Sequence, residues 1–415
     1  MQTSGDFLAE IEAIPAIDIR THIRADAPVA GDLSEIALYH DVQTELQSIG
    51  VPAEVFENQN AKKRVIEAAK YVDRIPNTTT YWCLTRILTD LYAAGPLHGC
   101  DIDDLYASVE KTAADPTWLA TVLEKANVAK VFHTCPWQSK LPKASDVFLP
   151  TLRLDSLINE AHMSRTLNQL TEVTGQTVYE VADLKKAVIA LFRRAVDAGV
   201  VAVGASFDPM VDFEEGNRDS ADRILSLVLL GQKANRDDRK ALRSYVMDLV
   251  LTECASHGIP FQLMLGIRHR PRADRYITAS EPGMVTGYTD LFTRHSGARF
   301  DVMTSNEALC HQLTVVGRNY RNVYFSGCWW YLMFPTSIRK IIRQRVEMLP
   351  KTKSNGFFSD AYCAEWIYGK AKLARREMAF ALSQMVDEGY LSRETALDVA
   401  RHYLYENPKR IYKVE

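Results

Sequence analysis

Three ionisable residues, Asp18, Arg20 and His22, alternate with isoleucine and threonine over residues 17–23. This alternation is typical of a β-strand, in which every second side chain points to the same face. Charged groups among apolar neighbours are stable only when they meet partners. Two interpretations follow. The residues form an ion pair at the end of a sheet, or they belong to the first strand of a barrel and reach its functional face.

Other polar and aromatic residues follow later apolar segments. If those segments are barrel strands, their ends carry functional groups to the same face. The residues in these positions are His133, Arg153, Asp155, Asp208, Arg268, His269, Trp329, Trp330 and Asp360. Structural alternatives remain open for several of them. His133 could cap a loop, residues 268–272 could form a solvated basic turn, and the two tryptophans could pack in a core or an interface instead of binding a sugar.

Eight short apolar segments are predicted to be strands, and helical segments separate most of them. They cover residues 17–23, 128–133, 147–152, 199–206, 260–266, 300–304, 322–326 and 356–360. Alternating strands and helices favour a parallel sheet, and eight units favour a closed (β/α)8 barrel of the TIM type. An open doubly wound sheet is less favoured because no glycine-rich phosphate loop begins a helix after any of these strands.

The chain is expected to be a single barrel domain over residues 1–415. About a hundred residues with helical periodicity separate the first two predicted strands, which is far more than a simple connection needs. We therefore predict a helical insertion at about 32–126. The apolar periodicity of the last part of the chain predicts C-terminal helices at about 364–405.

The composition excludes several classes of protein. Apolar residues make up 47% of the 415 residues, charged residues 24%, and the formal net charge is -3. These values are ordinary for a globular protein and provide no basic field for nucleic acid or an anionic membrane. We see no apolar run that could span a membrane, no secretory signal in the first twelve residues, and seven scattered cysteines without a CxxC motif. A reduced, cytoplasmic protein is expected.

Several segments together resemble the uronate (glucuronate) isomerases of the amidohydrolase superfamily. Residues 17–22 resemble the Asp-x-His-x-His strand of that superfamily, and residues 149–155 resemble a Leu-Pro-Thr-Phe-Arg-Pro-Asp segment. Residues 39–51 are similar to an Asp-His-Tyr helix that ends in Gly-Val. Residues 327–330 resemble a Gly-x-Trp-Trp segment, and residues 359–360 resemble the Thr-Asp at the end of the eighth strand.

The resemblance implies a (β/α)8 barrel with a helical insertion, a homo-oligomer, and the aldose–ketose isomerisation of a hexuronate in sugar-acid metabolism. It implies a divalent cation, often zinc, with His22 and Asp360 as the matching ligands. It also implies His40 as a proton-transfer residue and Arg153 as a group that binds the substrate carboxylate. The reaction moves a proton between adjacent carbons, so it needs a base and positive charge near the enediol oxygens.

The sequence departs from the family pattern where metal ligands are expected. Arg20 replaces the first histidine of the strand, Met264 replaces a histidine, and Gly204 with Ala205 replaces an Asp-His pair. A catalytic zinc site commonly has three protein ligands and a water, and a guanidinium has no free lone pair for a metal. The metal site is therefore expected to be weakened, holding one divalent cation or none.

Two hypotheses describe Arg20. Its guanidinium replaces the cation and binds a carboxylate or enediolate, or it forms an internal salt bridge with Asp360. The predicted catalytic residues are His22, His40, Asp360 and Arg20. The predicted substrate-binding residues are Arg153, Arg268, Trp329, Trp330 and His133. Two alternatives to a uronate isomerase remain: a lyase, epimerase or hydrolase acting on a related acidic sugar, and a non-catalytic uronate-binding paralogue.

Overall fold

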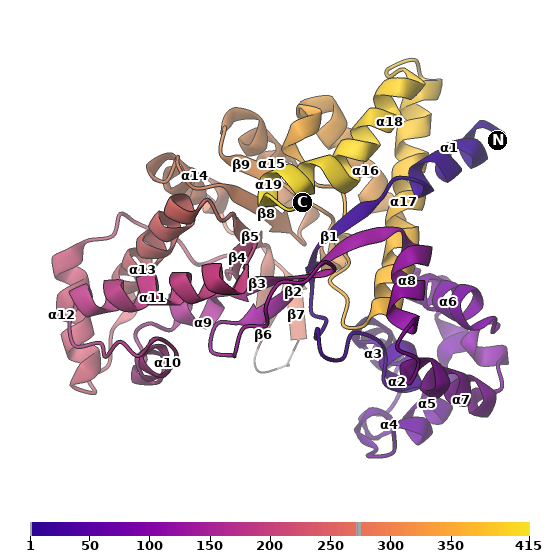
Figure 1. Cartoon of the computed structure of the whole chain (residues 1–415), viewed down its shortest axis with the longest axis horizontal. Helices are drawn as coiled ribbons and strands as arrows, with labels where there is room; N and C mark the ends of the chain where they lie inside the picture. Colours follow the sequence, from indigo (N-terminus) through magenta and orange to yellow (C-terminus); the bar gives the residue numbers. More distant parts are fainter. Residues whose placement is uncertain (1, 271, 273–274) are drawn as a thin grey trace. The chain divides into compact units, whose positions relative to one another are not determined.

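The computed structural model describes residues 2–270, 272 and 275–415 (Figure 1). The chain divides into two compact units. The first unit contains residues up to 133 together with 334–339 and 357–397. The second unit contains residues 134–333, 340–356 and 398–415. In the described part of the chain, no helix is long and apolar enough to cross a membrane, and all seven cysteines are free thiols.

Helices and strands alternate along most of the chain. The strands are β1 (Ala16–Thr21), β2 (Val128–Pro136), β3 (Phe148–Arg153), β4 (Ala202–Ser206), β5 (Phe261–Leu265), β6 (Ile267–Arg270), β7 (Arg275–Thr278), β8 (Phe300–Thr304) and β9 (Val323–Phe325). The helices before β3 are α1 (Gln2–Glu12), α2 (Leu33–Ala37), α3 (His40–Ser48), α4 (Ala53–Glu57), α5 (Ala61–Ala69), α6 (Thr79–Tyr92), α7 (Ile102–Ala113) and α8 (Trp118–Ala126). Those after β3 are α9 (Asp155–Asn159), α10 (Ser164–Thr174), α11 (Val181–Ala198), α12 (Arg218–Leu229), α13 (Arg236–His257), α14 (Met284–Arg294), α15 (Glu307–Asn319), α16 (Pro335–Met348), α17 (Ala364–Asp387), α18 (Arg393–Arg401) and α19 (Asn407–Tyr412).

The first unit is built around β1, which pairs in parallel with β2. Seven helices, α2 to α8, lie between these two strands in the sequence, as the predicted insertion requires. The long helix α17 packs against α1, α6 and α8 (Figure 1). All six residues of β1 are buried, so its charged side chains lie in the interior of this unit.

The predicted eighth strand at 356–360 is wrong as a regular strand. The segment nevertheless lies along β1, because Asp360 N donates to Arg20 O at 3.0 Å and His22 N donates to Ala361 O at 2.8 Å. Asp360 has a left-handed backbone with φ of 55°. A strand cannot continue through a left-handed residue, so the extended segment turns at Asp360.

The second unit contains a parallel sheet in the order β3-β4-β5-β8-β9. Residues of neighbouring strands pair directly, for example Gly204 with Gln262 and Met264 with Met303. Helices separate these parallel strands in the sequence (Figure 1). The predicted α/β class of the TIM-barrel type is confirmed, with seven regular parallel strands in the described part of the chain.

A short antiparallel hairpin was not predicted. It is formed by β6 and β7, which pair Arg268 with Ile277 and His269 with Tyr276. The interpretation of 268–272 as a solvated basic turn is therefore wrong for residues 268–270, which belong to β6. Residue 271 lies outside the described residues.

Helix α13 has local signals at both of its ends. Asn235 caps its first turn, and Asp238 completes a capping box by accepting from the Asn235 backbone N–H. The helix ends at Gly258, whose φ of 63° favours glycine. These signals fix the position of the helix, and therefore of the charged residues in its first two turns.

Candidate functional site

The carboxylate of Asp360 lies at the centre of a cluster of charged and aromatic side chains in the first unit. Arg20 Nε and His22 Nε2 each lie 3.2 Å from the same oxygen, Asp360 Oδ1. Arg20 is only 2% exposed, and Asp360 is buried as well. The structure therefore brings together three of the four predicted catalytic residues.

The charges around Asp360 keep it ionised. Burial by itself raises the pKa of this carboxyl group, but the hydrogen bond and charge of His22 oppose that effect. The charges of Arg20 and Lys370 lower the pKa further, so that it lies well below its usual range. A carboxylate can only accept hydrogen bonds, so Arg20 and His22 both donate to it.

A second buried carboxyl group, Asp18, lies on the same strand. Its Oδ1 accepts a hydrogen bond of 2.9 Å from the backbone N–H of Ser359. Burial raises the pKa of Asp18 to about 7, although the hydrogen bonds from Ser359 partly oppose this. Asp18 therefore ties β1 to the segment that carries Asp360 and titrates close to neutral pH.

His40, the fourth predicted catalytic residue, belongs to a group of three rings. The ring of Tyr362 stacks on that of His22, with centroids 4.8 Å apart, and meets His40 edge-on at 5.3 Å. Burial lowers the pKa of His40, and the charge of Asp41 partly opposes this. The pKa shift favours a neutral His40 near pH 7, which is the form that can accept a proton.

Two further residues of this cluster were not predicted from the sequence. Lys370 Nζ donates to the hydroxyl of Tyr39 at 2.9 Å, and that hydroxyl donates to the backbone oxygen of Asp360 at 3.1 Å. Lys370 is buried within α17. A lysine on the buried face of an apolar helix was the available signal, because such a charge needs a partner.

The residues present do not fit a catalytic zinc site. His22 and Asp360 provide two donors, and the guanidinium of Arg20 already contacts the Asp360 oxygen that faces His22. Among the described residues, no group of three histidine, cysteine, aspartate or glutamate side chains could hold a metal ion. The two donors therefore fall short of the set that zinc commonly requires.

Two of the substituted ligand positions lie on neighbouring strands of the second unit. A Cβ added at Gly204 would lie 2.7 Å from Gln262 O, so strand β5 leaves no room there for the side chain of an aspartate. Met264 is fully buried, and its sulfur atom lies 3.5 Å from the hydroxyl oxygen of Ser206. Both positions are packed as ordinary core.

The predicted substrate-binding arginines of the second unit already have carboxylate partners. Arg153 donates to Asp155 Oδ1 at 2.9 Å and to the Ser206 hydroxyl at 3.0 Å. Arg268 Nε lies 3.1 Å from Asp208 Oδ2, and its Nη2 lies 2.8 Å from Glu281 Oε1. Each guanidinium is thus held in a defined orientation, and its charge is largely balanced.

The remaining predicted residues differ in exposure. Trp329 is buried, whereas Trp330 is half-buried and stacks on Tyr331 with centroids 4.8 Å apart. The burial of Trp329 fits core packing. His133, in the first unit, is buried in β2, and burial lowers its pKa.

No protein-family model matches the sequence. Two curated relatives are similar to part of it. The uronate isomerase of Phenylobacterium zucineum is 27% identical over 146 residues, which cover 35% of this chain and 29% of the relative. The uronate isomerase of Cutibacterium acnes is 26% identical over 129 residues, which cover 30% of this chain and 26% of the relative. The matched segments thus span less than a third of each relative.

Solved structures match the whole fold. The uronate isomerase of Thermotoga maritima has a TM-score of 0.89 at 16% identity, covering 99% of this chain and 97% of the other. The glucuronate isomerase of Caulobacter crescentus also has a TM-score of 0.89 at 16% identity, covering 100% of this chain and 94% of the other. At this identity the likeness establishes the fold. The chain therefore resembles uronate isomerases in its whole fold and, over about a third of its length, in sequence.

Proposed function

We propose that this chain is a sugar-acid isomerase of the uronate isomerase type, which interconverts an aldose and a ketose form of a hexuronate without a metal ion. The observation that carries this proposal is the pairing of Arg20 and His22 on one oxygen of Asp360, beside His40. This arrangement places a permanent positive charge and a neutral base in one cluster. Uronate isomerase relatives and structural neighbours support the class of reaction.

The reaction needs one base and no redox partner. A base removes the proton from C2 of the open-chain aldose, and the electrons of that bond form an enediolate. The hydroxyl proton at C2 is lost as a carbonyl forms there, O1 gains a proton, and the base returns its proton to C1. His40 is the proposed base because its lowered pKa favours the neutral ring, which is the form that can accept a proton.

In the proposed reaction, the permanent positive charge of the cluster comes from Arg20, and His22 supplies a polar side chain beside it. Arg20 is almost fully buried, so we assign it two roles: it orients the Asp360 carboxylate, and its positive charge acts on the site without direct contact with the substrate. The His22 side chain is 24% exposed and donates to Asp360, so it is the accessible end of this network. Preorganised charge of this kind stabilises an oxyanion with little reorganisation.

The proposal is tested by proton exchange in heavy water. Chelator-treated protein is incubated with a panel of hexuronates, and deuterium incorporation at the carbon next to the carbonyl is followed by NMR. We expect exchange with at least one hexuronate, and loss of that exchange in His40→Gln. Binding of a hexuronate without exchange would instead favour a non-catalytic uronate-binding paralogue.

A matched control separates a local effect from misfolding. His311 is an exposed histidine in α15 of the second unit. His311→Gln is expected to retain full exchange, and the thermal unfolding curves of both variants report whether the fold is intact. Equal loss of exchange in the two variants would contradict the assignment of His40.

A further inference from the structure

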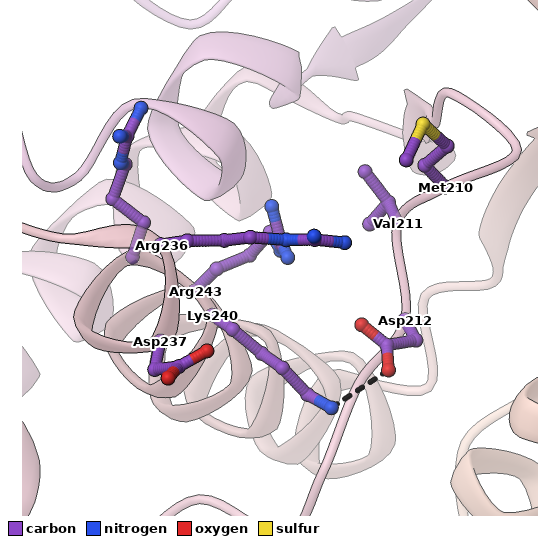
Figure 2. Close-up of a pocket in the computed structure, with 8 residues that line it drawn as sticks. Met210, Val211, Asp212, Arg236, Asp237, Lys240 and Arg243 are labelled. Carbon is purple, nitrogen blue, oxygen red and sulfur yellow. Dashed lines mark hydrogen bonds and ion pairs between the residues drawn. The ribbon is translucent and has the colours of Figure 1, made fainter.

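A separate cavity of about 540 Å³ lies in the second unit. Its lining comes from the loop after β4 and from the first two turns of α13 (Figure 2). Figure 2 shows Met210, Val211 and Asp212 on the loop, across the cavity from the helix residues Arg236, Lys240 and Arg243. The volume is within the range of small-molecule sites, roughly 300–1,000 Å³.

Four basic residues of α13 line this cavity: Arg236, Arg239, Lys240 and Arg243. Their spacing of three, four and seven residues places them on one face of the helix. Like charges so close together destabilise a helix unless an anion lies between them. Arg236 and Arg239 also lie in the first turn of the helix, where the helix dipole favours negative charge and disfavours basic side chains.

The lysine is the only one of the four with a carboxylate partner among the described residues. Lys240 Nζ lies 2.7 Å from Asp212 Oδ2 and 3.6 Å from Glu214 Oε2. Arg239 donates to the backbone oxygen of Asn235 at 3.2 Å, within its own helix. For Arg236, no ion pair is found within the described part of the chain.

Arg243 is the deepest of the four. Its Nε is buried and has no hydrogen-bond partner in the described residues. Its guanidinium lies over the ring of Phe213, with its central carbon 5.9 Å from the ring centroid. Phe213 in turn packs against Tyr288, which is 2% exposed and whose hydroxyl also has no partner in the described residues. A half-buried guanidinium with an unsatisfied donor is a place where an ordered water or an anion can complete the hydrogen bonding.

We infer that this cavity binds a phosphate group, either inorganic phosphate or the phosphate monoester of a small molecule. The charged side chains that line the cavity are three arginines, one lysine and two aspartates, which gives the lining an excess of two positive charges. A phosphate dianion matches this excess and has enough oxygens for several planar guanidinium groups. A monocarboxylate such as a hexuronate brings one charge and two oxygens, so the cavity is distinct in chemistry from the proposed isomerase site.

Calorimetric titration of the full chain with inorganic phosphate and with a hexose 6-phosphate, at constant ionic strength, tests this inference. We expect saturable binding of one phosphate group per chain. Tighter binding of the hexose phosphate identifies a phosphate ester as the ligand, and equal affinity identifies free phosphate. Because heat is the readout, the result does not depend on isomerase activity.

Substitutions locate the site. Arg243→Gln and the exposed double variant Arg236→Gln/Arg239→Gln are each expected to weaken phosphate binding by about tenfold or more, since each removes charge-assisted hydrogen bonds. Arg193→Gln, an exposed arginine of α11 outside the cavity, is the matched control and is expected to bind as the parent chain does. The double variant keeps the test valid if Arg243→Gln unfolds.

Three results would overturn the inference. They are the absence of saturable phosphate binding, equal affinity in the parent chain and the folded double variant, and displacement of phosphate by a hexuronate at equal concentration. The last result would assign the cavity to carboxylates instead.

Discussion

Arg20 and Asp360 form a buried ion pair, with Arg20 Nε 3.2 Å from Asp360 Oδ1, although 340 positions separate them in the sequence. The pair links the first strand to the segment that follows the last regular strand. His22 Nε2 lies at the same distance from the same oxygen, so the Asp360 carboxylate orients both the Arg20 guanidinium and the His22 ring. Four of the predictions below follow from the surroundings of this pair, and one follows from the buried Asp18 beside it.

Removing Arg20 is expected to destabilise the fold strongly. Arg20→Met leaves the Asp360 carboxylate buried with one partner fewer, and loss of one member of a buried pair lowers the free energy of unfolding by about 3–5 kcal/mol. Urea unfolding measures this change. The double variant Arg20→Met/Asp360→Leu is expected to regain part of the loss. A single variant as stable as the parent chain would show that the pair contributes nothing.

The stability of the chain is expected to fall as the pH rises through Asp18. Burial raises the pKa of this group from 3.8 to about 7, so the folded state keeps a proton that the unfolded state releases. Stability from this group is therefore complete below about pH 4 and declines up to about pH 7. Asp18→Asn keeps an acceptor for Ser359 and should flatten this part of the curve. Parallel curves from pH 4 to 8 for the two proteins would rule out a titrating Asp18.

Replacing the proposed base is expected to affect the reaction and not the fold. His40→Gln should lower the rate of hexuronate isomerisation by about 100- to 10,000-fold, the usual contribution of a positioned general base. Steady-state kinetics at saturating hexuronate measures the change in kcat. A higher KM with an unchanged kcat would assign His40 to substrate binding instead of proton transfer.

Lys370 is expected to matter more for stability than a neighbouring lysine. Lys370→Met removes the donor to the Tyr39 hydroxyl, and leaving a buried polar group with one partner fewer costs about 1–3 kcal/mol. The matched control is Lys372→Met, which breaks the partly exposed ion pair with Glu12 and removes an ammonium group 5.8 Å from the centroid of the Tyr368 ring. Such surface pairs contribute about 0–1 kcal/mol. Equal losses in thermal unfolding would contradict a structural role for the Lys370–Tyr39 hydrogen bond.

Removing metal ions is expected to leave the chain active. Chelator treatment should change neither stability nor isomerisation, and elemental analysis should find far less than one zinc per chain. Arg20→His places a third donor beside His22 and Asp360 and is expected to raise the zinc content. One tightly bound zinc in the parent chain, with activity lost on its removal, would contradict the proposed metal-free mechanism.

Much of the fold could be predicted because the signals are local. The alternation of β1, the apolar runs of β3, β5 and β8, and the helical periodicity between β1 and β2 depend on neighbours within a few residues. Most predicted strands therefore agree with the structure within a few positions. The predicted eighth strand is wrong as a regular strand: it makes isolated backbone hydrogen bonds next to β1, and its last residue, Asp360, has a left-handed backbone. The β6–β7 hairpin was missed since its charged residues do not show an apolar pattern.

The residue types and their order show which groups need partners: Asp18, Arg20 and His22 on a buried strand, and Asp360 after two buried aromatics. The identity of each partner depends on how distant segments pack together. The tertiary structure placed Asp360 on Arg20 and His22, Ser359 on Asp18, and Lys370 on Tyr39, all across long separations. It also balanced Arg153 and Arg268 with carboxylates, and it left Arg243 Nε without a hydrogen-bond partner among the described residues. Local chemistry shows that a buried charge must be compensated, but the compensating group is chosen by packing between distant segments.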